Sequence, residues 1–242
     1  MRTGRIPRFH VAAGLAAGAT IELPREAAHH ATRALRLRVG ESLTLFNGTG
    51  GEYAATIASI GRDGVRVVVG AHESRERESP LAVTLVQGIA GADRMDFIIQ
   101  KAVELGVAAI QPVLTSKSIV RLSKERGEAR LAHWQRIVIA ACEQCGRNRI
   151  PEVFPADSLA QYSPSPDAGK VMLSPQAASD LKGLARTPLV LAVGPEAGFD
   201  SAEEKLLAQK GFVAARLGPR ILRTETAALA ALAALNAIRG DF

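Results

Sequence analysis

Apolar and polar residues alternate along the first seventy residues at the spacing of short β-strands. In the first such segment the alternation predicts that Leu43, Leu45 and Phe46 face inward. Tight turns are expected at Asn47–Gly51 and Gly61–Gly64, because glycine and asparagine tolerate a positive φ. The predicted strands are Glu41–Asn47, Glu52–Ile60 and Val65–Gly70. Strands joined by tight turns form a meander, which we expect to close into a small barrel.

A short basic helix is expected before these strands, over His29–Val39. Its Arg33 and Arg36 are three residues apart, so a helix would place both on one face. The polar, charged stretch Ala71–Pro80 ends in proline and marks the clearest domain boundary in the sequence.

After this boundary the pattern changes to continuous apolar segments that alternate with helical periodicity. Uninterrupted apolar strands are typical of a sheet that is covered on both faces. The predicted strands are Leu81–Gln87, Val107–Leu114, Val171–Ser174, Leu189–Val193 and Val213–Leu217, and the predicted helices are Asp93–Leu105, Glu125–Gly146, Ser201–Lys210 and Thr224–Arg239. Alternating strands and helices indicate an α/β domain with a largely parallel sheet. We therefore expect one domain over residues 1–73 and a larger one over residues 74–242.

Composition fits a folded, cytoplasmic protein. Of the 242 residues, 47% are hydrophobic and 22% are charged, so a sizeable core can be buried. No run is long and apolar enough to span a bilayer, and Val11–Thr20 lacks the strongly hydrophobic stretch of a signal peptide. Cys142 and Cys145 fall inside a predicted helix, where small packing residues are a better interpretation than a zinc or redox pair.

The N-terminal region carries most of the net charge of +6. Residues 1–40 hold seven arginines against Glu22 and Glu26, which accounts for +5 of that total. These arginines are Arg2, Arg5, Arg8, Arg25, Arg33, Arg36 and Arg38. Such a region favours a polyanion partner, since guanidinium groups bind phosphates bidentately; ordinary surface contacts are the alternative for some of them. Aromatic residues make up 4% of the chain, so backbone contacts are expected rather than base stacking.

Two loops near the C-terminus have the features of a ligand site. The first, Gly194–Asp200, follows an apolar strand and contains Glu196; Ser201 is expected to begin a helix, with Glu204 completing a capping box. Ligands of open α/β sheets bind at the carboxyl ends of strands, and glycines let the backbone approach them closely. An ordinary strand–helix turn is the alternative for this loop alone.

The second loop, Leu217–Thr226, also follows a strand and begins with Gly-Pro after Leu217. Free backbone N–H groups at the start of the next helix attract anions or polar ring atoms. Ile221 and Leu222 would be costly to expose unless an apolar group, such as an adenine ring, covers them. Two such loops after consecutive strands predict a shared pocket more strongly than either loop does alone.

Motifs of several other enzyme classes are missing from the sequence. No Gly-rich dinucleotide motif follows a strand, no P-loop is present, and no His, Asp or Glu residues have metal-ligand spacing. In one helix Lys101 and Glu104 are spaced to pair locally. At the end of another lie Glu143, Gln144, Arg147, Asn148 and Arg149. These form either a solvated helix end or, through Gln144 and Arg147, a face toward substrate or a partner subunit.

Together these segments resemble the RsmE family of 16S ribosomal RNA uridine-N3 methyltransferases, within the SPOUT superfamily. The matching segments span nearly the whole chain. They are Arg8-Phe9, HHATRALRLRVGE (His29–Glu41), QKAVELGV (Gln100–Val107), EQCGRNRIPEV (Glu143–Val153), GPEAGF (Gly194–Phe199) and LGPRILRTETAAL (Leu217–Leu229). The last two are the most specific.

The resemblance implies a PUA-like RNA-binding β-barrel at the N-terminus and a SPOUT methyltransferase domain with a trefoil knot at the C-terminus. It also implies a homodimer that acts on 16S ribosomal RNA or the small ribosomal subunit, without metal or membrane. S-adenosylmethionine is the implied cofactor, held by Leu173, Gly194, Pro195, Glu196, Gly198, Leu217, Gly218, Ile221, Leu222, Arg223 and Thr224. The residues expected to contact RNA are Arg8, Arg25, Arg33, Arg36 and Arg147.

Two positions depart from the family pattern. Ala197 stands where the cofactor loop of the family usually has glycine, which would cost about 1 kcal/mol if the position needs a positive φ. We expect the loop to tolerate it. Cys145 stands where serine is common, which argues against a hydroxyl role there.

For methyl transfer to N3 of a uracil, the N3 proton must be lost and no metal is required. We expect Arg223 to stabilise the developing oxygen charge, and Glu225 or Glu196 to accept the proton. The alternatives are a non-enzymatic RNA-binding or ribosome-assembly factor, which would not need the two loops, and a phosphate- or nucleotide-binding hydrolase, against which the missing P-loop and metal ligands argue.

Overall fold

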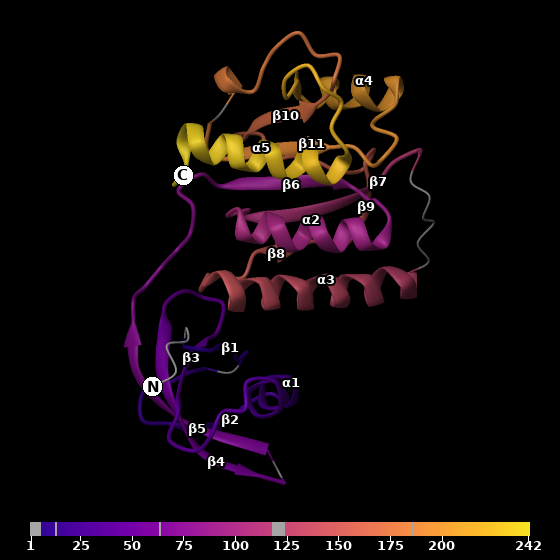
Figure 1. The fold of residues 1–242 in the computed structure, drawn as a ribbon. Coiled ribbons are helices and arrows are strands. Elements are labelled where there is room, and N and C mark those ends of the chain that lie inside the picture. The colour runs from indigo at the N-terminus through magenta and orange to yellow at the C-terminus, as the bar shows by residue number, and fades with distance from the viewer. Residues whose placement is uncertain (1–5, 13, 63, 118–123, 185) are drawn as a thin grey trace. The chain divides into compact units, whose positions relative to one another are not determined.

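The computed structural model describes residues 6–12, 14–62, 64–117, 124–184 and 186–242. They form two compact units (Figure 1). The first contains the chain up to Glu78 together with Cys142–Ile150, and the second contains Ser79–Ala141 and Pro151–Phe242. Two of the basic N-terminal residues, Arg2 and Arg5, lie outside the described ranges.

The first unit is built on a five-stranded sheet with the order β1-β3-β4-β5-β2. Its strands are β1 (Arg8–His10), β2 (Thr20–Glu22), β3 (Ser42–Phe46), β4 (Glu52–Gly61) and β5 (Gly64–Glu73). β3, β4 and β5 pair antiparallel in succession, so the predicted meander is confirmed. Leu43, Leu45 and Phe46 are at most 1% exposed, as the alternation predicts. Leu43 and Leu45 share an apolar core with Phe9 and Val67. Closure of this sheet into a barrel stays a prediction.

The helix expected over His29–Val39 has different bounds. α1 spans Arg25–His29 and continues as a single π-helical turn, η1 (His30–Ala34). Pro24 precedes the first turn, where a proline ring is compatible with helix initiation. The helix ends before Arg36, whose φ of +54° is left-handed and incompatible with a right-handed helix. Arg33 and Arg36 therefore do not share one helical face.

The second unit is built on a sheet whose strands follow the order β12-β10-β11-β6-β7-β8, with β9 also pairing with β7. The strands are β6 (Val83–Gly88), β7 (Ala109–Leu114), β8 (Glu152–Val153), β9 (Asp157–Ser158), β10 (Gly169–Leu173), β11 (Leu189–Val193) and β12 (Val213–Ala215). Every pairing is parallel, so the predicted parallel α/β domain is confirmed. All five residues of β11 are buried, as expected for a central strand covered on both faces.

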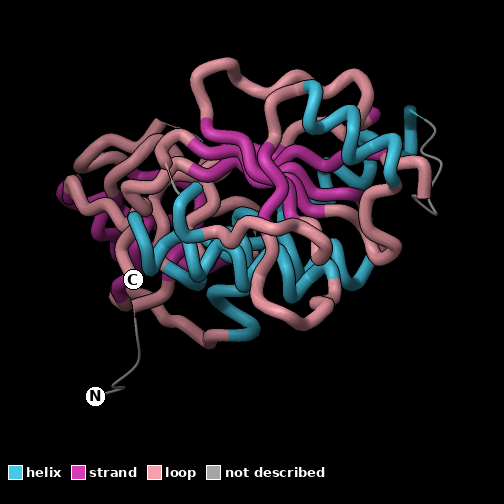
Figure 2. The backbone as a smooth tube through the Cα atoms, turned by 90° about the horizontal axis from the view of Figure 1, so that it is seen from above, coloured by secondary structure: helices cyan, strands magenta, loops and turns pink. Residues whose placement is uncertain are grey.

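Helices lie on both sides of these strands (Figure 2). They are α2 (Ala92–Glu104), α3 (Lys124–Cys145), α4 (Ser201–Gln209) and α5 (Thr224–Arg239), with a short 3₁₀ turn, η2 (Lys182–Leu184). α2 and α5 pack against each other. Leu207 of α4 joins Val86 and Val190 in an apolar cluster on one face of the sheet. Lys101 and Glu104 form the predicted local ion pair, at 2.7 Å.

The chain after α3 returns to the first unit and is buried there. Arg147 and Asn148 are 5% and 0% exposed, so the interpretation as a solvated helix end is wrong for these two residues. Gln144 and Arg149 are exposed, and a contact of Gln144 with substrate or a partner subunit stays a prediction. The Arg8 guanidinium forms a buried ion pair with Glu52 and donates to the Asn148 side-chain oxygen. The Asn148 amide nitrogen donates to Glu52 at 3.2 Å, and Arg147 forms an ion pair with Glu78. Residues 142–150 are thus held to the first unit by buried charges rather than facing substrate through Arg147.

Candidate cofactor site

The two Gly-Pro loops lie at the same edge of the parallel sheet in the second unit. Gly194–Asp200 follows β11, and the loop that begins at Leu217 follows β12 after one residue. Because parallel strands end at one edge, the loops meet there, in the position where open α/β sheets bind ligands. With the segment after β10 they line one pocket of about 280 Å³, near the lower end of the range for small-molecule sites.

Glycines allow the first loop to fold back on itself and on β6. A Cβ at Gly194 would lie 2.7 Å from the backbone nitrogen of Phe199, and one at Gly88 would lie 2.5 Å from Cδ of Pro195. Neither position has room for a side chain. Gly198 has a φ of +68°, in the left-handed region that favours glycine. Ala197 has no positive φ, so the condition under which alanine would be strained there is absent.

Gln87, at the end of β6, joins the two loops from within the core. Its side chain is fully buried, and Nε2 donates to Thr224 Oγ1 at 3.0 Å and to the carbonyl oxygen of Gly194 at 3.4 Å. The Thr224 hydroxyl in turn donates to the Gly194 carbonyl at 2.6 Å. The start of the first loop and the start of α5 are therefore fixed relative to each other by three hydrogen bonds.

Glu196 is fastened to the beginning of α2. One of its carboxylate oxygens accepts from the backbone N–H of Gly91 at 2.9 Å and from the Arg94 guanidinium at 2.7 Å. Burial alone would raise the pKa of Glu196, but these hydrogen bonds and the Arg94 charge hold it below its ordinary value. Glu196 is thus a carboxylate at neutral pH, and it already accepts hydrogen bonds from two donors.

The far end of the first loop is held by the segment after β7. Asp200 caps α4 by accepting from the backbone of Ala202 and Glu203, and Glu203 completes the capping box. The box is therefore Asp200–Glu203 rather than the predicted Ser201–Glu204. Ser116 donates its backbone N–H to Glu203 and its hydroxyl to Asp200, both at 2.7 Å.

The second loop presents apolar side chains to the pocket. Ile221 is 82% exposed and Leu222 is partly exposed, although both line the pocket. An apolar group bound between the loops would cover this surface, as expected from the sequence. At the start of α5 the N-cap residue Arg223 makes no side-chain cap, so the first backbone N–H groups of the helix lack that partner.

Most of the predicted cofactor residues line this pocket. They are Leu173, Gly194, Pro195, Glu196, Gly198, Leu217, Gly218, Ile221, Leu222 and Thr224. Arg223 and Glu225 flank the lining residue Thr224 without being part of the lining. Arg223 is exposed; Glu225 is half-buried, and its Oε2 is a buried oxygen without a hydrogen-bond partner among the described residues.

Sequence reasoning missed Gln87 and Arg94. A polar residue at the end of a buried strand, as Gln87 is, and a cation in the first turn of a helix, as Arg94 is, were the available signals. It also missed the segment after β10, where Ser174, Pro175 and Gln176 line the pocket.

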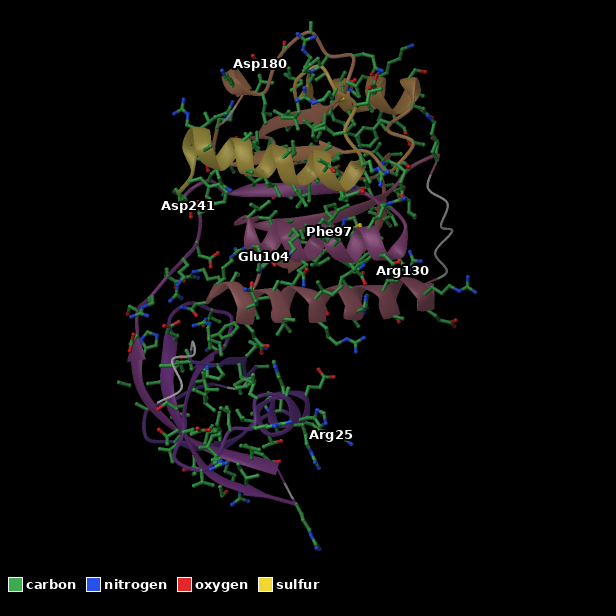
Figure 3. The ribbon with its side chains drawn as sticks, viewed as in Figure 1. Arg25, Phe97, Glu104, Arg130, Asp180 and Asp241 are labelled. Atoms are coloured by element: carbon green, nitrogen blue, oxygen red, sulfur yellow. The ribbon has the colours of Figure 1, made fainter. Side chains whose placement is uncertain are left out.

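The residues predicted to contact RNA fall into two groups in the first unit. Arg25, Arg33 and Arg36 are exposed, and Arg25 extends from α1 into solvent (Figure 3). Arg8 and Arg147 are buried and paired with Glu52 and Glu78. The first group is accessible to a polyanion and the second is not.

The described part of the chain has neither a membrane-spanning helix nor a cluster of metal ligands. None of its helices combines the length and the apolar character that crossing a membrane requires. Among these same residues, no cluster of three or more His, Cys, Asp or Glu side chains is arranged to hold a metal ion.

Comparison with known families identifies both parts of the chain. Residues 77–236 match the RNA methyltransferase domain, and residues 23–70 match the RNA methyltransferase PUA domain. The chain is 33% identical over 246 residues to ribosomal RNA small subunit methyltransferase E of Buchnera aphidicola subsp. Schizaphis graminum, with 98% of each chain covered. It is 31% identical over 241 residues to the enzyme of that name from Bacillus subtilis, covering 92% of this chain and 93% of the relative.

Solved structures are similar over the same length. A ribosomal RNA small subunit methyltransferase E from Neisseria gonorrhoeae, bound to S-adenosylmethionine, has a TM-score of 0.92 and 40% identity, covering 98% of this chain and all of that one. A Legionella pneumophila protein in complex with the same cofactor has a TM-score of 0.95 and 38% identity, covering 99% and 100%.

Proposed function

The chain belongs to the RNA methyltransferase family that includes ribosomal RNA small subunit methyltransferase E, and on that premise we propose that it methylates N3 of one uridine in 16S ribosomal RNA. S-adenosylmethionine is the methyl donor. The observation that carries the proposal is the pocket between the Gly194–Asp200 and Leu217–Thr226 loops. Its shape comes from the two segments whose motifs are the most specific of those that resemble the family.

The residues of the pocket fit this cofactor. Exposed Ile221 and partly exposed Leu222 supply the apolar surface that an adenine ring needs. Gly194, where a side chain has no room, brings bare backbone to the pocket. When bound, S-adenosylmethionine supplies an electrophilic methyl group on a sulfonium sulfur. The chain's own residues must hold that group, exclude water and manage the proton that uracil N3 loses.

Proton removal is assigned to Glu225. Glu196 is a poorer acceptor, because its lowered pKa and its two hydrogen bonds stabilise the charged form. Glu225 has a carboxylate oxygen without a donor among the described residues, so no hydrogen bond has to be broken for that oxygen to take the N3 proton. Arg223, one residue before the pocket-lining Thr224, is assigned to the uracil oxygen that gains charge.

Contact with RNA is assigned to the first unit, through the exposed Arg25, Arg33 and Arg36. Arg8 and Arg147 are given a structural role instead, because a phosphate would have to displace Glu52 or Glu78 from a buried pair. The partner is 16S ribosomal RNA, either free or within the small ribosomal subunit.

The remaining features of the family are part of the same proposal. They are a trefoil knot in the second unit, closure of the first unit into a PUA-like barrel, a homodimer and a cytoplasmic location. The exposed Ile221 supports a subunit or substrate that covers the rim of the pocket.

Transfer of labelled methyl groups from S-adenosylmethionine to small subunits isolated from cells lacking this protein tests the activity. Mass spectrometry of the RNA should then find one N3-methyluridine that the untreated subunits lack. Arg223→Ala should lose most turnover while it retains cofactor binding, and full activity in that variant would remove Arg223 from the mechanism.

A non-enzymatic RNA-binding factor is the competing function. It would use the exposed arginines of the first unit and would not need the pocket. Calorimetric titration with S-adenosylmethionine separates the two: the proposed enzyme should release or take up heat on binding, whereas no heat at millimolar cofactor would favour the RNA-binding factor.

A further inference from the structure

Arg94 brings a positive charge to the cofactor loop from a distant part of the second unit. It lies in the first turn of α2, about one hundred residues before the loop, and its side chain is 48% exposed. One guanidinium nitrogen donates to Glu196 at 2.7 Å. Among the described residues, the other guanidinium nitrogens meet no acceptor, so several N–H donors still point to solvent.

The position of Arg94 is unfavourable for a purely structural cation. The first turn of a helix carries a partial positive charge that disfavours arginine. Glu196 already accepts from the Gly91 backbone, so it would keep a hydrogen bond without Arg94. An exposed ion pair of this kind adds little stability. Arg94 therefore fits better as a cation that Glu196 orients toward something outside the protein.

A second carboxylate lies within electrostatic range of the same guanidinium. Glu225, in the first turn of α5, interacts electrostatically with Arg94. Arg94 thus holds a hydrogen bond to Glu196, which lines the cofactor pocket, and interacts more weakly, through charge alone, with Glu225, which the proposed function makes the proton acceptor. A charge held in this way needs no reorganisation when the substrate arrives.

The chemistry of uracil calls for two cations. N3 lies between two carbonyl groups, so the negative charge that develops as its proton leaves is shared by the oxygens on both sides. One guanidinium can reach one of these oxygens. Arg223 accounts for one of them in the proposed function, and the other has no partner assigned.

We propose that Arg94 is a further catalytic residue, which donates hydrogen bonds to the second uracil oxygen beside N3; this rests on the proposed function. Glu196 is then a positioning residue that acts through Arg94. The N3 proton moves to Glu225, the N3 electron pair forms the bond to the methyl carbon, and the electrons of the sulfur–carbon bond remain on sulfur. Arg94 stays protonated throughout.

Kinetics of Arg94→Gln, with Arg94→Lys and Arg239→Gln beside it, test this assignment. Arg239 is an exposed arginine in the last turn of α5 and is the matched control. With small subunits that lack the methyl group, Arg94→Gln should lower kcat about 100-fold at neutral pH. Its affinity for S-adenosylmethionine, measured by calorimetry, should stay within threefold of the unchanged chain. Arg94→Lys should retain part of the rate that Arg94→Gln loses, and Arg239→Gln should keep the full rate of the unchanged chain.

The pH profile distinguishes this role from simple fastening of the loop. At higher pH uracil N3 loses its proton with less help, so the rate deficit of Arg94→Gln should shrink as pH rises. If the rate deficit of Arg94→Gln is constant with pH, or is matched by a loss of cofactor affinity, the assignment is overturned. Arg94 would then only hold the Gly194–Asp200 loop in place.

Failure of the proposed function would look different. If the unchanged chain transfers no methyl group to small-subunit RNA, the proposed function itself is wrong. If the unchanged chain is active and Arg94→Gln matches it, the function stands and the assignment of Arg94 falls.

Discussion

Gly198 is the residue on which the backbone of the cofactor loop depends most directly. Its φ is +68°, and a Cβ at this position would meet no atom within 4 Å. Crowding is therefore not the reason for glycine here; the left-handed backbone is. The neighbouring Ala197 has no positive φ and needs no such freedom.

Replacement of Gly198 by alanine isolates this strain. Gly198→Ala should lower the free energy of unfolding by about 1–2 kcal/mol, because a side chain destabilises the left-handed conformation by that amount. Urea denaturation measures it. Gly183→Ala is the matched control, since a Cβ there also meets open space but the φ is not positive. Equal stability of the two variants would contradict the strain argument.

Elements whose ends are marked by local chemistry were predictable from the sequence. β11 has the predicted bounds, Leu189–Val193, because an apolar run ends at Gly-Pro, and α5 has the predicted bounds, Thr224–Arg239, because a glycine follows it. The bounds predicted for the helix His29–Val39 were wrong, because it begins at Arg25 and ends at Ala34, and nothing in its composition reveals the left-handed φ of Arg36. A short-range pattern does not specify such a backbone reversal.

Glu52 should control the acid stability of the first unit. Burial alone would raise its pKa, but hydrogen bonds from Arg8 and Asn148, with the charges of Arg8 and Arg77, bring it below the ordinary value of 4.5. A carboxyl whose pKa is lower in the folded state stabilises the fold above its unfolded pKa, and this contribution is lost as pH falls through the folded pKa. The loss should therefore begin near pH 4.5 and grow with further acidification.

Glu52→Gln tests this contribution. At neutral pH the variant should be less stable by about 3–5 kcal/mol, because Arg8 is left as a buried charge without its partner. Its stability should also depend less on pH below 4.5 than that of the unchanged chain. Denaturation followed at several pH values measures both effects. If the stability of the two chains falls equally with pH below 4.5, another carboxyl is responsible for the acid sensitivity.

At the scale of the molecule, polyanion binding should depend strongly on salt. If Arg25, Arg33 and Arg36 contact phosphates, each contact releases counterions, and affinity for small-subunit RNA should fall roughly tenfold or more over a few-fold rise in salt. Replacing Arg33 with Gln should reduce the slope of log affinity against log salt by about one. Glu22→Gln, on β2 of the same unit, removes an exposed charge of opposite sign and should not reduce the slope. If the affinity for RNA does not change with salt concentration, these arginines do not contact phosphates.

The candidate site was predictable where its residues are contiguous in the chain, and not where they converge from afar. Gly194–Phe199 and Leu217–Thr224 each carry a recognisable local pattern. Gln87 and Arg94 reach the same loops from about one hundred residues earlier, through the parallel pairing of β6 with β11 and the packing of α2 with α5. Periodicity predicts that such strands pair, but not which of their side chains meet.

The return of residues 142–150 to the first unit has a consequence for how such chains can be recombined. A single crossover near Glu78 would join one parent's N-terminal strands to the other parent's Arg147 and Asn148. Asn148, which forms buried hydrogen bonds with Arg8 and Glu52, would then come from the other parent. Exchange of the whole first unit between relatives therefore requires three junctions, one after Glu78 and one on each side of the nine-residue segment Cys142–Ile150. We expect chimeras made with the first junction alone to fold poorly.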